Sequence, residues 1–345
     1  MRLGIICPSE IALRRFMPAL QKVNELKFAG IGICSAKERF ACDLPAEIVV
    51  NEILEAERAK AQVFVDQYGG RIFESYASIV ASKDIDALYI PLPPALHFHW
   101  AKMALENGKH VLVEKPSTIS AENTCELSGI ADSKGLALHE NYMFIFHNQL
   151  DAIESIINSG EIGDVRLYRI AFGFPRRAKN DFRYNRELGG GALIDAGGYT
   201  IKYATRLLGN SASLRYAQLN YIDEFEVDIY GSAALVNSDG VTAQIAFGMD
   251  NNYKCELEVW GSKGCLTTGR VLTAPVGFTP QVIIRKGNND EIRELPADDA
   301  FEKSIKHFLL CVSDETVRRD NYAALCRQAA LVEEFAKLAK MNDRS

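Results

Sequence analysis

The chain has 345 residues, enough for about two domains of roughly 150 residues each. It is 48% hydrophobic and 24% charged, which is typical of a globular protein with a full core. The formal charge of −6, from 39 Lys plus Arg and 45 Asp plus Glu, argues against nucleic acid as the main partner.

No run approaches the ~20 apolar residues that cross a bilayer, so we expect no membrane partner. The opening MRLGIIC is interrupted by Pro8 too early for a signal-peptide core. The eight cysteines are scattered and form no CxxC pair, which is typical of reduced thiols in a cytoplasmic protein. No His, Cys or Asp cluster has metal-ligand spacing, so no metal is predicted.

Residues 1–140 alternate between short apolar strands and helices, which predicts βαβ units around a parallel sheet. Helices are expected within 11–23, where Pro18 should bend the helix or shift its start, and over 51–68, ended by Gly69-Gly70. Residues 36–50 look like an insertion of unclear role. The expected strands are 2–7, 28–34, 87–90, 110–113 and one that begins at 136.

The pattern changes in the second domain, predicted over 141–345 for substrate binding and oligomerisation. A half-exposed strand is expected over 164–174 and a helix over 192–208. The segments after it, separated by turn residues, predict a large, mostly antiparallel open sheet. Two helices, 298–312 and 321–339, close the chain and could pack back on the first domain. The series of strands is 214–222, 226–236, 241–248, 254–260, 264–268, 281–286 and 291–295.

The loop after the first strand is where an α/β fold would hold a dinucleotide. It reads Cys7-Pro8-Ser9-Glu10-Ile11-Ala12, and of the G-x-G-x-x-G/A pattern only the final small residue is present. Cys7 and Ser9 are small enough for a phosphate to approach, and Ser9 could cap the helix or donate to phosphate. The alternative that this loop is only a capped helix start, with no ligand, stays open.

The end of the second strand bears on the choice of cofactor. NAD sites usually place Asp or Glu there, but this chain has Ser35 and Lys37. A carboxylate would repel a 2′-phosphate, so its absence favours NADP over NAD. For Lys37 alone, a solvated basic turn is equally plausible.

Two further motifs carry groups that can move protons. VLVEKP places Lys115 at the carboxyl end of a buried strand, where open α/β sheets bind ligands. GGGALIDAGGY carries Asp195 and Tyr199 at i, i+4 spacing on one expected helix face. Tyr199 could donate a proton, and a nearby Lys115 ammonium would favour the phenolate. Asp195 could bind a sugar hydroxyl, orient Lys115 or act only as a helix N-terminal charge, and Tyr199 could be a core aromatic.

Together these motifs and YIPLPPALHFHWAKMALENGKH resemble the Gfo/Idh/MocA family of NAD(P)-dependent oxidoreductases. The likeness runs through nearly the whole chain. ENYMFIFHNQL and DFRYNRELGGGALIDAGGY look most similar to the NDP-hexose 3-ketoreductase and dihydrodiol dehydrogenase branches. The resemblance implies an N-terminal Rossmann domain followed by an α/β domain whose sheet serves substrate and oligomer contacts.

The resemblance also implies site residues. Lys115 would be the catalytic Lys of the EKP motif, with Tyr199 and Asp195 as its partners. His97 is expected to position neighbours rather than to donate protons. The cofactor-binding set is Cys7, Ser9, Glu10, Ile11, Ser35, Lys37, Pro91, Leu92, Pro93, His97, Glu114 and Lys115. The substrate-binding set is Asn141, Arg183, Tyr184, Asp195 and Tyr199.

The sequence thus predicts an NADP-dependent oxidoreductase that transfers a hydride between nicotinamide and the carbonyl or alcohol of a sugar or sugar nucleotide, with NAD as a possible cofactor. A homodimer or homotetramer through the C-terminal sheet is expected. The alternative is a non-catalytic or regulatory binding protein that kept the fold and lost its phosphate loop. A third option is a tightly bound cofactor recycled between two substrates.

Overall fold

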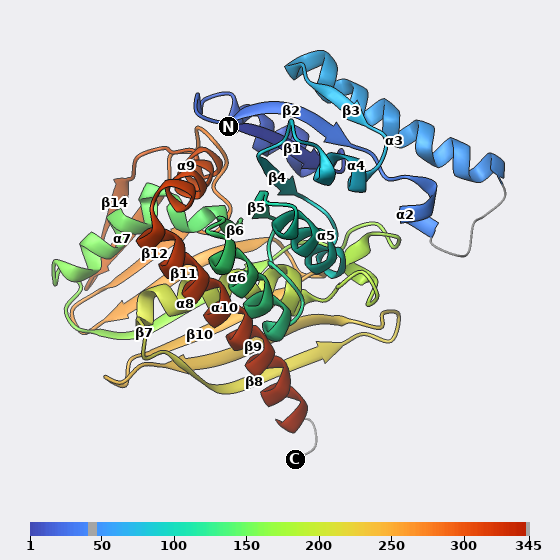
Figure 1. The fold of residues 1–345 in the computed structure, drawn as a ribbon. Coiled ribbons are helices and arrows are strands. Elements are labelled where there is room, and N and C mark those ends of the chain that lie inside the picture. Colours follow the sequence, from blue (N-terminus) through green and yellow to red (C-terminus); the bar gives the residue numbers. More distant parts are fainter. Residues whose placement is uncertain (41–46, 343–345) are drawn as a thin grey trace. The chain divides into compact units, whose positions relative to one another are not determined.

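The computed structural model describes residues 1–40 and 47–342, so part of the predicted 36–50 insertion lies outside the described residues. The chain forms two compact units, each with its own sheet (Figure 1). Unit 1 contains residues 1–118, 122–141 and 304–326, and unit 2 contains 119–121, 142–303 and the residues from 327 onward. The predicted α/β class, with a parallel sheet followed by a mostly antiparallel one, is confirmed.

Unit 1 is built on a six-stranded parallel sheet in the order β3-β2-β1-β4-β5-β6. The order reverses between β1 and β4, and a parallel α/β sheet binds its ligand at such a switch point. β4 and most of β5 are buried on both faces, as expected for a sheet covered on both sides. The strands are β1 (Arg2–Ile6), β2 (Lys27–Gly32), β3 (Arg71–Phe73), β4 (Ala87–Ile90), β5 (His110–Val113) and β6 (Leu138–Glu140).

The helices of this half follow the predicted places with shifted bounds. The first consists of a π-helical turn, η1, and a short α1 with Pro18 at its first turn, as a proline allows. α3 begins at Glu47, within the predicted insertion. The bounds are η1 (Ala12–Phe16), α1 (Met17–Leu20), α2 (Ala36–Phe40), α3 (Glu47–Tyr68), α4 (Tyr76–Ala81), α5 (Pro94–Glu106) and α6 (Ala121–Lys134). The last two helices, α9 (Ala300–Ser313) and α10 (Glu315–Asn342), each contain residues of both units.

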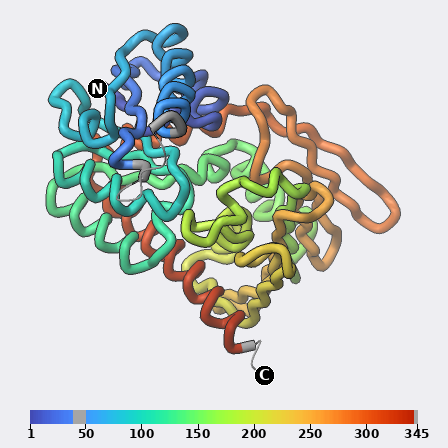
Figure 2. The backbone as a smooth tube through the Cα atoms, turned by 90° about the vertical axis from the view of Figure 1, so that its right-hand side faces the viewer, coloured from blue at the N-terminus to red at the C-terminus, as the bar shows by residue number. Residues whose placement is uncertain are grey.

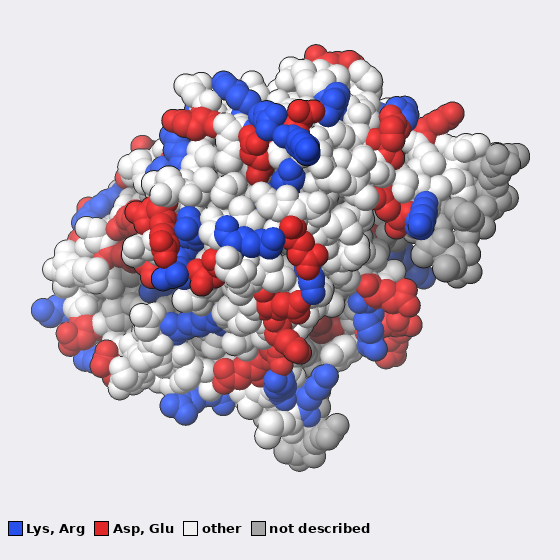
Figure 3. Space-filling view, viewed as in Figure 1, with Lys and Arg blue, Asp and Glu red and all other residues white. Residues whose placement is uncertain are grey.

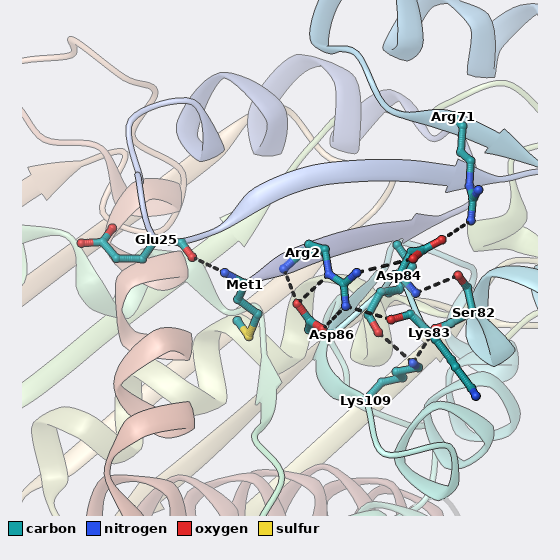
Figure 4. A network of polar contacts seen from close by, with 10 residues as sticks. Met1, Arg2, Glu25, Arg71, Ser82, Lys83, Asp84, Asp86 and Lys109 are labelled. Carbon is teal, nitrogen blue, oxygen red and sulfur yellow. Dashed lines mark hydrogen bonds and ion pairs between the residues drawn. The ribbon is translucent and has the colours of Figure 1, made fainter.

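The amino ends of the unit 1 strands are tied together by charged groups (Figure 4). The guanidinium of Arg2 at the start of β1 donates to the Asp86 carboxylate before β4, with an Nη2–Oδ1 distance of 2.8 Å. Lys109 before β5 donates to the carbonyls of Ser82 and Ile85 at 2.6 and 2.7 Å. These contacts hold the edge opposite the carboxyl ends, which leaves the carboxyl ends for chemistry.

Unit 2 contains an eight-stranded sheet in the order β14-β13-β12-β11-β7-β10-β9-β8, in which only β7 and β10 pair in parallel. Strands β11 and β13 alternate buried and exposed side chains, and α8 packs on β7 and β10. The strands are β7 (Val165–Gly173), β8 (Ser213–Tyr221), β9 (Asp228–Val236), β10 (Thr242–Gly248), β11 (Lys254–Gly261), β12 (Cys265–Gly269), β13 (Gln281–Lys286) and β14 (Asn289–Glu294). The β13–β14 hairpin projects at the right of Figure 2.

The remaining helical elements of unit 2 include the two that the predicted GGGALIDAGGY segment forms, η4 and α8. They are η2 (Met143–Phe146), α7 (Asn148–Asn158), η3 (Phe182–Tyr184), the π-helical η4 (Leu193–Gly197) and α8 (Gly198–Leu208). The predicted helix over 192–208 is therefore present, but its first turn is a π-turn.

The surface agrees with the acidic, mixed composition. On the face in Figure 3, Lys and Arg side chains are interspersed with Asp and Glu, without a broad basic area. Among the described residues, no helix combines the length and apolar character that crossing a membrane requires. The seven described cysteines carry thiols rather than disulfide bonds.

Candidate active site

The loop that follows β1 adopts a conformation suited to a phosphate-binding turn. Cys7 has φ of 84°, the left-handed region that a glycine normally occupies, at the position of the first motif glycine. The Ser9 hydroxyl accepts from the Ala12 amide at 3.3 Å and so caps η1. Glu10 is exposed and pairs with Arg14, and Ile11 is 38% exposed. The turn and an accessible helix start are thus kept without the glycines, so the residues present fit a dinucleotide phosphate.

The carboxyl end of β2 is organised by two carboxylates that the sequence analysis did not use. Glu38 accepts from the Ser35 amide and hydroxyl, both at 2.8 Å, and from the first amides of α4, at Tyr76 and Ala77. Glu57 accepts from the amide of Cys34 at 2.8 Å. The sequence analysis treated this strand end as free of carboxylates. That interpretation needs correction, because the Glu38 carboxylate binds the amide and hydroxyl of Ser35. Lys37 is exposed.

His97 joins two loops at the carboxyl edge of the unit 1 sheet. Its Nδ1 lies 2.7 Å from the Pro116 carbonyl oxygen, and its Nε2 lies 2.7 Å from that of Leu92. The ring is fully buried, and burial lowers its pKa to about 4 although both carbonyls oppose this. His97 therefore fixes the Pro91-Leu92-Pro93 segment against the EKP loop, and its ring nitrogens are engaged by backbone rather than offered to a ligand.

Glu114 and Lys115 follow β5 directly. The Glu114 carboxylate accepts from the Tyr89 hydroxyl and from Asn141 Nδ2, both at 2.6 Å. Burial raises the pKa of Glu114, and these donors together with the adjacent Lys115 oppose the rise. Asn141 Oδ1 accepts from the Ser304 hydroxyl at 2.8 Å. Asn141, predicted to bind substrate, is therefore engaged in holding the EKP motif.

In unit 2, a buried carboxylate requires a glycine at position 191, the last of the glycine triplet. Asp228, at the start of β9, accepts from the Leu193 amide at 2.7 Å, at the beginning of η4. Gly191 has φ of 122°, and a Cβ there would lie 2.4 Å from Asp228 Oδ1. Burial raises the pKa of Asp228 to about 6, although the amides of Leu193 and Ala192 lower it. Asp228 thus anchors the helix that carries Asp195 and Tyr199.

Asp195 forms part of a charged cluster with the predicted substrate residue Arg183. The Arg183 Nε lies 2.7 Å from Asp195 Oδ2, and its Nη1 lies 3.1 Å from Asp181 Oδ1. The Arg183 side chain is 21% exposed, so a ligand can reach the guanidinium. Asp195 lies in the π-turn and Tyr199 in α8, and a π-turn encloses one more residue than an α-turn. The expected alignment of the two side chains on one helix face stays a prediction.

The Tyr199 ring lies in an aromatic cluster of unit 2. Its ring centroid is 5.0 Å from that of Tyr142, 5.5 Å from Phe144 and 5.3 Å from Phe172. Only 8% of Tyr199 is exposed, so the ring is rigidly held. Tyr184 has a different role: its hydroxyl accepts from the Arg177 amide and donates to the Met249 carbonyl, which engages it in the fold.

Predicted site residues therefore group by unit. Unit 1 carries Lys115 and the predicted cofactor residues, and unit 2 carries Asp195, Tyr199, Arg183 and Tyr184. Sequence reasoning missed Glu38, Glu57, Asp228 and Ser304. Asp228 had a usable signal, since it is the last acid before the uncharged run 229–236 of the predicted strand.

Comparison with known proteins extends this picture. Residues 26–142 match the model for an oxidoreductase family with a NAD-binding Rossmann fold, and residues 150–267 match the GFO/IDH/MocA C-terminal domain. The chain is 35% identical over 343 residues to dTDP-3,4-didehydro-2,6-dideoxy-alpha-D-glucose 3-reductase of Saccharopolyspora spinosa, covering 97% of this chain and 96% of that one. The enzyme of the same name from Actinomadura kijaniata is 36% identical over 332 residues, with 96% and 93% covered.

A solved structure supports the same relationship. KijD10, a 3-ketoreductase from Actinomadura kijaniata in complex with NADP and TDP-benzene, matches with a TM-score of 0.87 and 34% identity, covering 98% of this chain and 97% of that one. The predicted family is thereby confirmed. With both family domains matched in order and relatives above 30% identity along its whole length, the chain belongs to the Gfo/Idh/MocA family of NAD(P)-dependent oxidoreductases.

Proposed function

We propose that this chain is an NADP-dependent 3-ketoreductase that acts on a nucleotide-linked deoxy sugar. The observation that carries the proposal is the match, at about one third identity and nearly full coverage, to four reductases of dTDP-3,4-didehydro-2,6-dideoxy-alpha-D-glucose. NADP and TDP-benzene occupy the related KijD10 structure. The same substrate class and cofactor therefore have the strongest support here.

Bound NADPH would supply a hydride to the carbonyl carbon. Residues of unit 1 offer the means to hold it: the turn at Cys7, the capped start of η1 at Ser9, and the exposed Lys37 for a 2′-phosphate. Glu10, Ile11 and Ser35 would line the same cofactor, as would the Pro91-Leu92-Pro93 segment. We assign His97 to positioning and Glu114 to holding Lys115, since both are engaged with neighbouring groups.

Lys115 and Tyr199 would complete the reduction. The Tyr199 hydroxyl would donate a proton to the carbonyl oxygen, and the Lys115 ammonium would stabilise developing negative charge on that oxygen. Solved KijD10 variants replace one lysine by Ala or Glu and one tyrosine by Phe. Those two positions are separated by as many residues as Lys115 and Tyr199, which supports the pairing. Asp195 and Arg183 would bind polar groups of the sugar nucleotide.

The test measures NADPH oxidation with the dTDP-linked 3-keto sugar. Lys115→Ala and Tyr199→Phe should each lower kcat by roughly 10²–10⁴-fold, the usual contribution of acid–base groups. The double variant should lose little more than the worse single variant, because both act on one step. Matched controls are Lys102→Ala, whose exposed ammonium pairs with Glu126, and Tyr253→Phe, an exposed tyrosine.

Four results would each overturn the proposal or a part of it. Full turnover in Lys115→Ala would remove the mechanism. Failure to bind NADPH and NADH at millimolar concentration would instead favour the non-catalytic alternative. A free sugar reduced as fast as the nucleotide-linked one would exclude the assigned substrate class, and nucleotide that co-purifies with the protein would favour a recycled cofactor.

We further propose that the exposed face of the unit 2 sheet joins two copies of the chain in a homodimer, itself the building block of any tetramer. A groove of about 1170 Å³ runs along this face, between apolar side chains such as Tyr216 and Ile283. Arg169 pairs with Glu258 there, so the face carries both charges and can complement a second copy. Light scattering should give a dimer or tetramer that Ala246→Glu reduces to monomer, whereas a monomeric native protein would exclude the interface.

The described cysteines form no disulfide bonds, which supports a reducing, cytoplasmic compartment for this protein.

A further inference from the structure

A second cluster of reactive side chains lies within unit 1, apart from the EKP loop. It joins His139 of β6 to His307 and Cys311 of α9, and one potential ligand atom of each residue lies within 4.8 Å of the other two. His139 and Cys311 are buried, and His307 is half-buried. The i, i+4 spacing of His307 and Cys311 places both on one face of α9. Because His139 lies far away in the sequence, ligand spacing could not predict this cluster.

The hydrogen bonds of His139 are those of a metal ligand. The hydroxyl proton of Ser304 goes to Asn141 Oδ1, so the 2.9 Å contact between His139 Nε2 and Ser304 Oγ must be donated by the imidazole. In the neutral ring this places the lone pair on Nδ1. Metal-binding histidines characteristically donate their other ring N–H to such an outer partner, which fixes the tautomer.

We propose that His139, His307 and Cys311 bind one zinc-type divalent cation, with a water or other small ligand in the fourth position. Two imidazoles and a thiolate suit Zn²⁺, whereas Mg²⁺ and Ca²⁺ require oxygen ligands that this cluster does not offer. This site goes beyond the proposed reductase activity. Its link through Ser304 and Asn141 to Glu114 couples the cation to the EKP motif.

Binding of one cation by all three residues requires their ligand atoms to move closer together. Tetrahedral Zn–N and Zn–S bond lengths place ligand atoms about 3.3–3.7 Å apart, so atoms at the 4.8 Å limit must approach by about 1.1–1.5 Å. The half-buried His307 can supply this movement by rotating its side chain.

A cation on Cys311 would take the place of the thiol proton, because the thiolate is the form that binds metals. The Arg318 guanidinium lies next to this residue, since its Nη1 donates to the Cys311 carbonyl at 3.0 Å. Its positive charge would partly balance the thiolate.

The test titrates the chelator-treated full chain with Zn²⁺ and, as a spectroscopic probe, with Co²⁺. One ion per chain should bind, and Co²⁺ should give the visible bands of a tetrahedral site with a near-ultraviolet thiolate charge-transfer band. Cys311→Ser should remove the charge-transfer band and weaken Zn²⁺ binding at least tenfold, and His307→Gln should weaken it similarly. Cys265→Ser and the exposed His99→Gln serve as controls and should bind as the native chain does.

Two outcomes would overturn the site: less than one tenth of an ion per chain at a twofold excess of Zn²⁺, or a Co²⁺ spectrum unchanged by Cys311→Ser. Folding of each variant is verified by circular dichroism, and His307→Gln, at a half-buried position, provides a readout should Cys311→Ser not fold. These measurements require no substrate, so they remain decisive even if the reductase proposal fails.

Discussion

Asp228 should make the stability of this protein depend on pH in the direction opposite to most of its carboxylates. In the folded state it is buried below the glycine triplet, and its pKa is about 6 rather than the ordinary 3.8. A folded pKa above the unfolded one means that the folded state binds the proton more tightly. The stabilisation is therefore complete below about pH 4 and is lost as pH rises through about 6.

The size of the effect follows from the shift. About two pKa units at 1.36 kcal/mol each give about 3 kcal/mol between pH 4 and pH 6.5. Other groups act in the opposite direction, Glu161 most clearly, because Arg293 and Lys286 lower its pKa to about 2. The Asp228 contribution must therefore be measured as a difference between two proteins.

The assay compares urea unfolding of the native chain and of Asp228→Asn at several pH values. The variant cannot ionise at this position, so its stability relative to the native chain should rise by up to about 3 kcal/mol between pH 4 and pH 6.5. Glu291→Gln, at an exposed position, provides the control and should show no rise. A difference that stays constant across this range would refute the reasoning. Activity of Asp228→Asn should also fall, because its amide cannot accept from all the same backbone groups.

Three further substitutions test the supports of the site. Ser304→Ala removes the donor to Asn141, so it should lower the free energy of unfolding in urea by about 1–3 kcal/mol and also lower kcat. An unchanged free energy of unfolding and an unchanged kcat would contradict this role of Ser304. Gly191→Ala should lower the free energy of unfolding by about 3 kcal/mol or more, because its Cβ would meet Asp228. Gly240→Ala is the control: Gly240 has φ of 80° with open space around it, so the loss should be only about 1 kcal/mol. Cys7→Gly should tighten NADPH binding in a fluorescence titration by relieving the left-handed strain, and weaker binding would count against the turn.

Much of the fold could be predicted because its elements are local. Apolar runs such as 87–90 and 110–113 predicted the central strands, which are buried and parallel as expected. β3 was missed because three residues after two glycines give too short a pattern. The π-turn at Leu193–Gly197 was also missed, since its geometry depends on the carboxylate from β9 and not on its own residues.

The site was predictable only where a motif is continuous. Lys115 and Tyr199 were identified because each lies in a short, recognisable segment. The cofactor argument at Ser35 relied on the absence of an acid, but Glu38 folds back from the following helix onto that position. Similarly, His139 and Cys311 come together only through tertiary packing. Contacts between distant segments have no spacing signature in one sequence.

The three carboxylates that the sequence analysis missed share one physical origin. Loops at strand ends leave backbone amides without strand partners, and buried amides need acceptors. In this protein carboxylates supply them: Glu38 at Ser35, Glu57 at Cys34 and Asp228 at Leu193. A carboxylate can accept several amides at once, which rigidifies the loop, but its burial opposes ionisation. Burial raises the pKa of Asp228 to about 6, so a change of pH should act on the start of η4 before acid unfolds the chain.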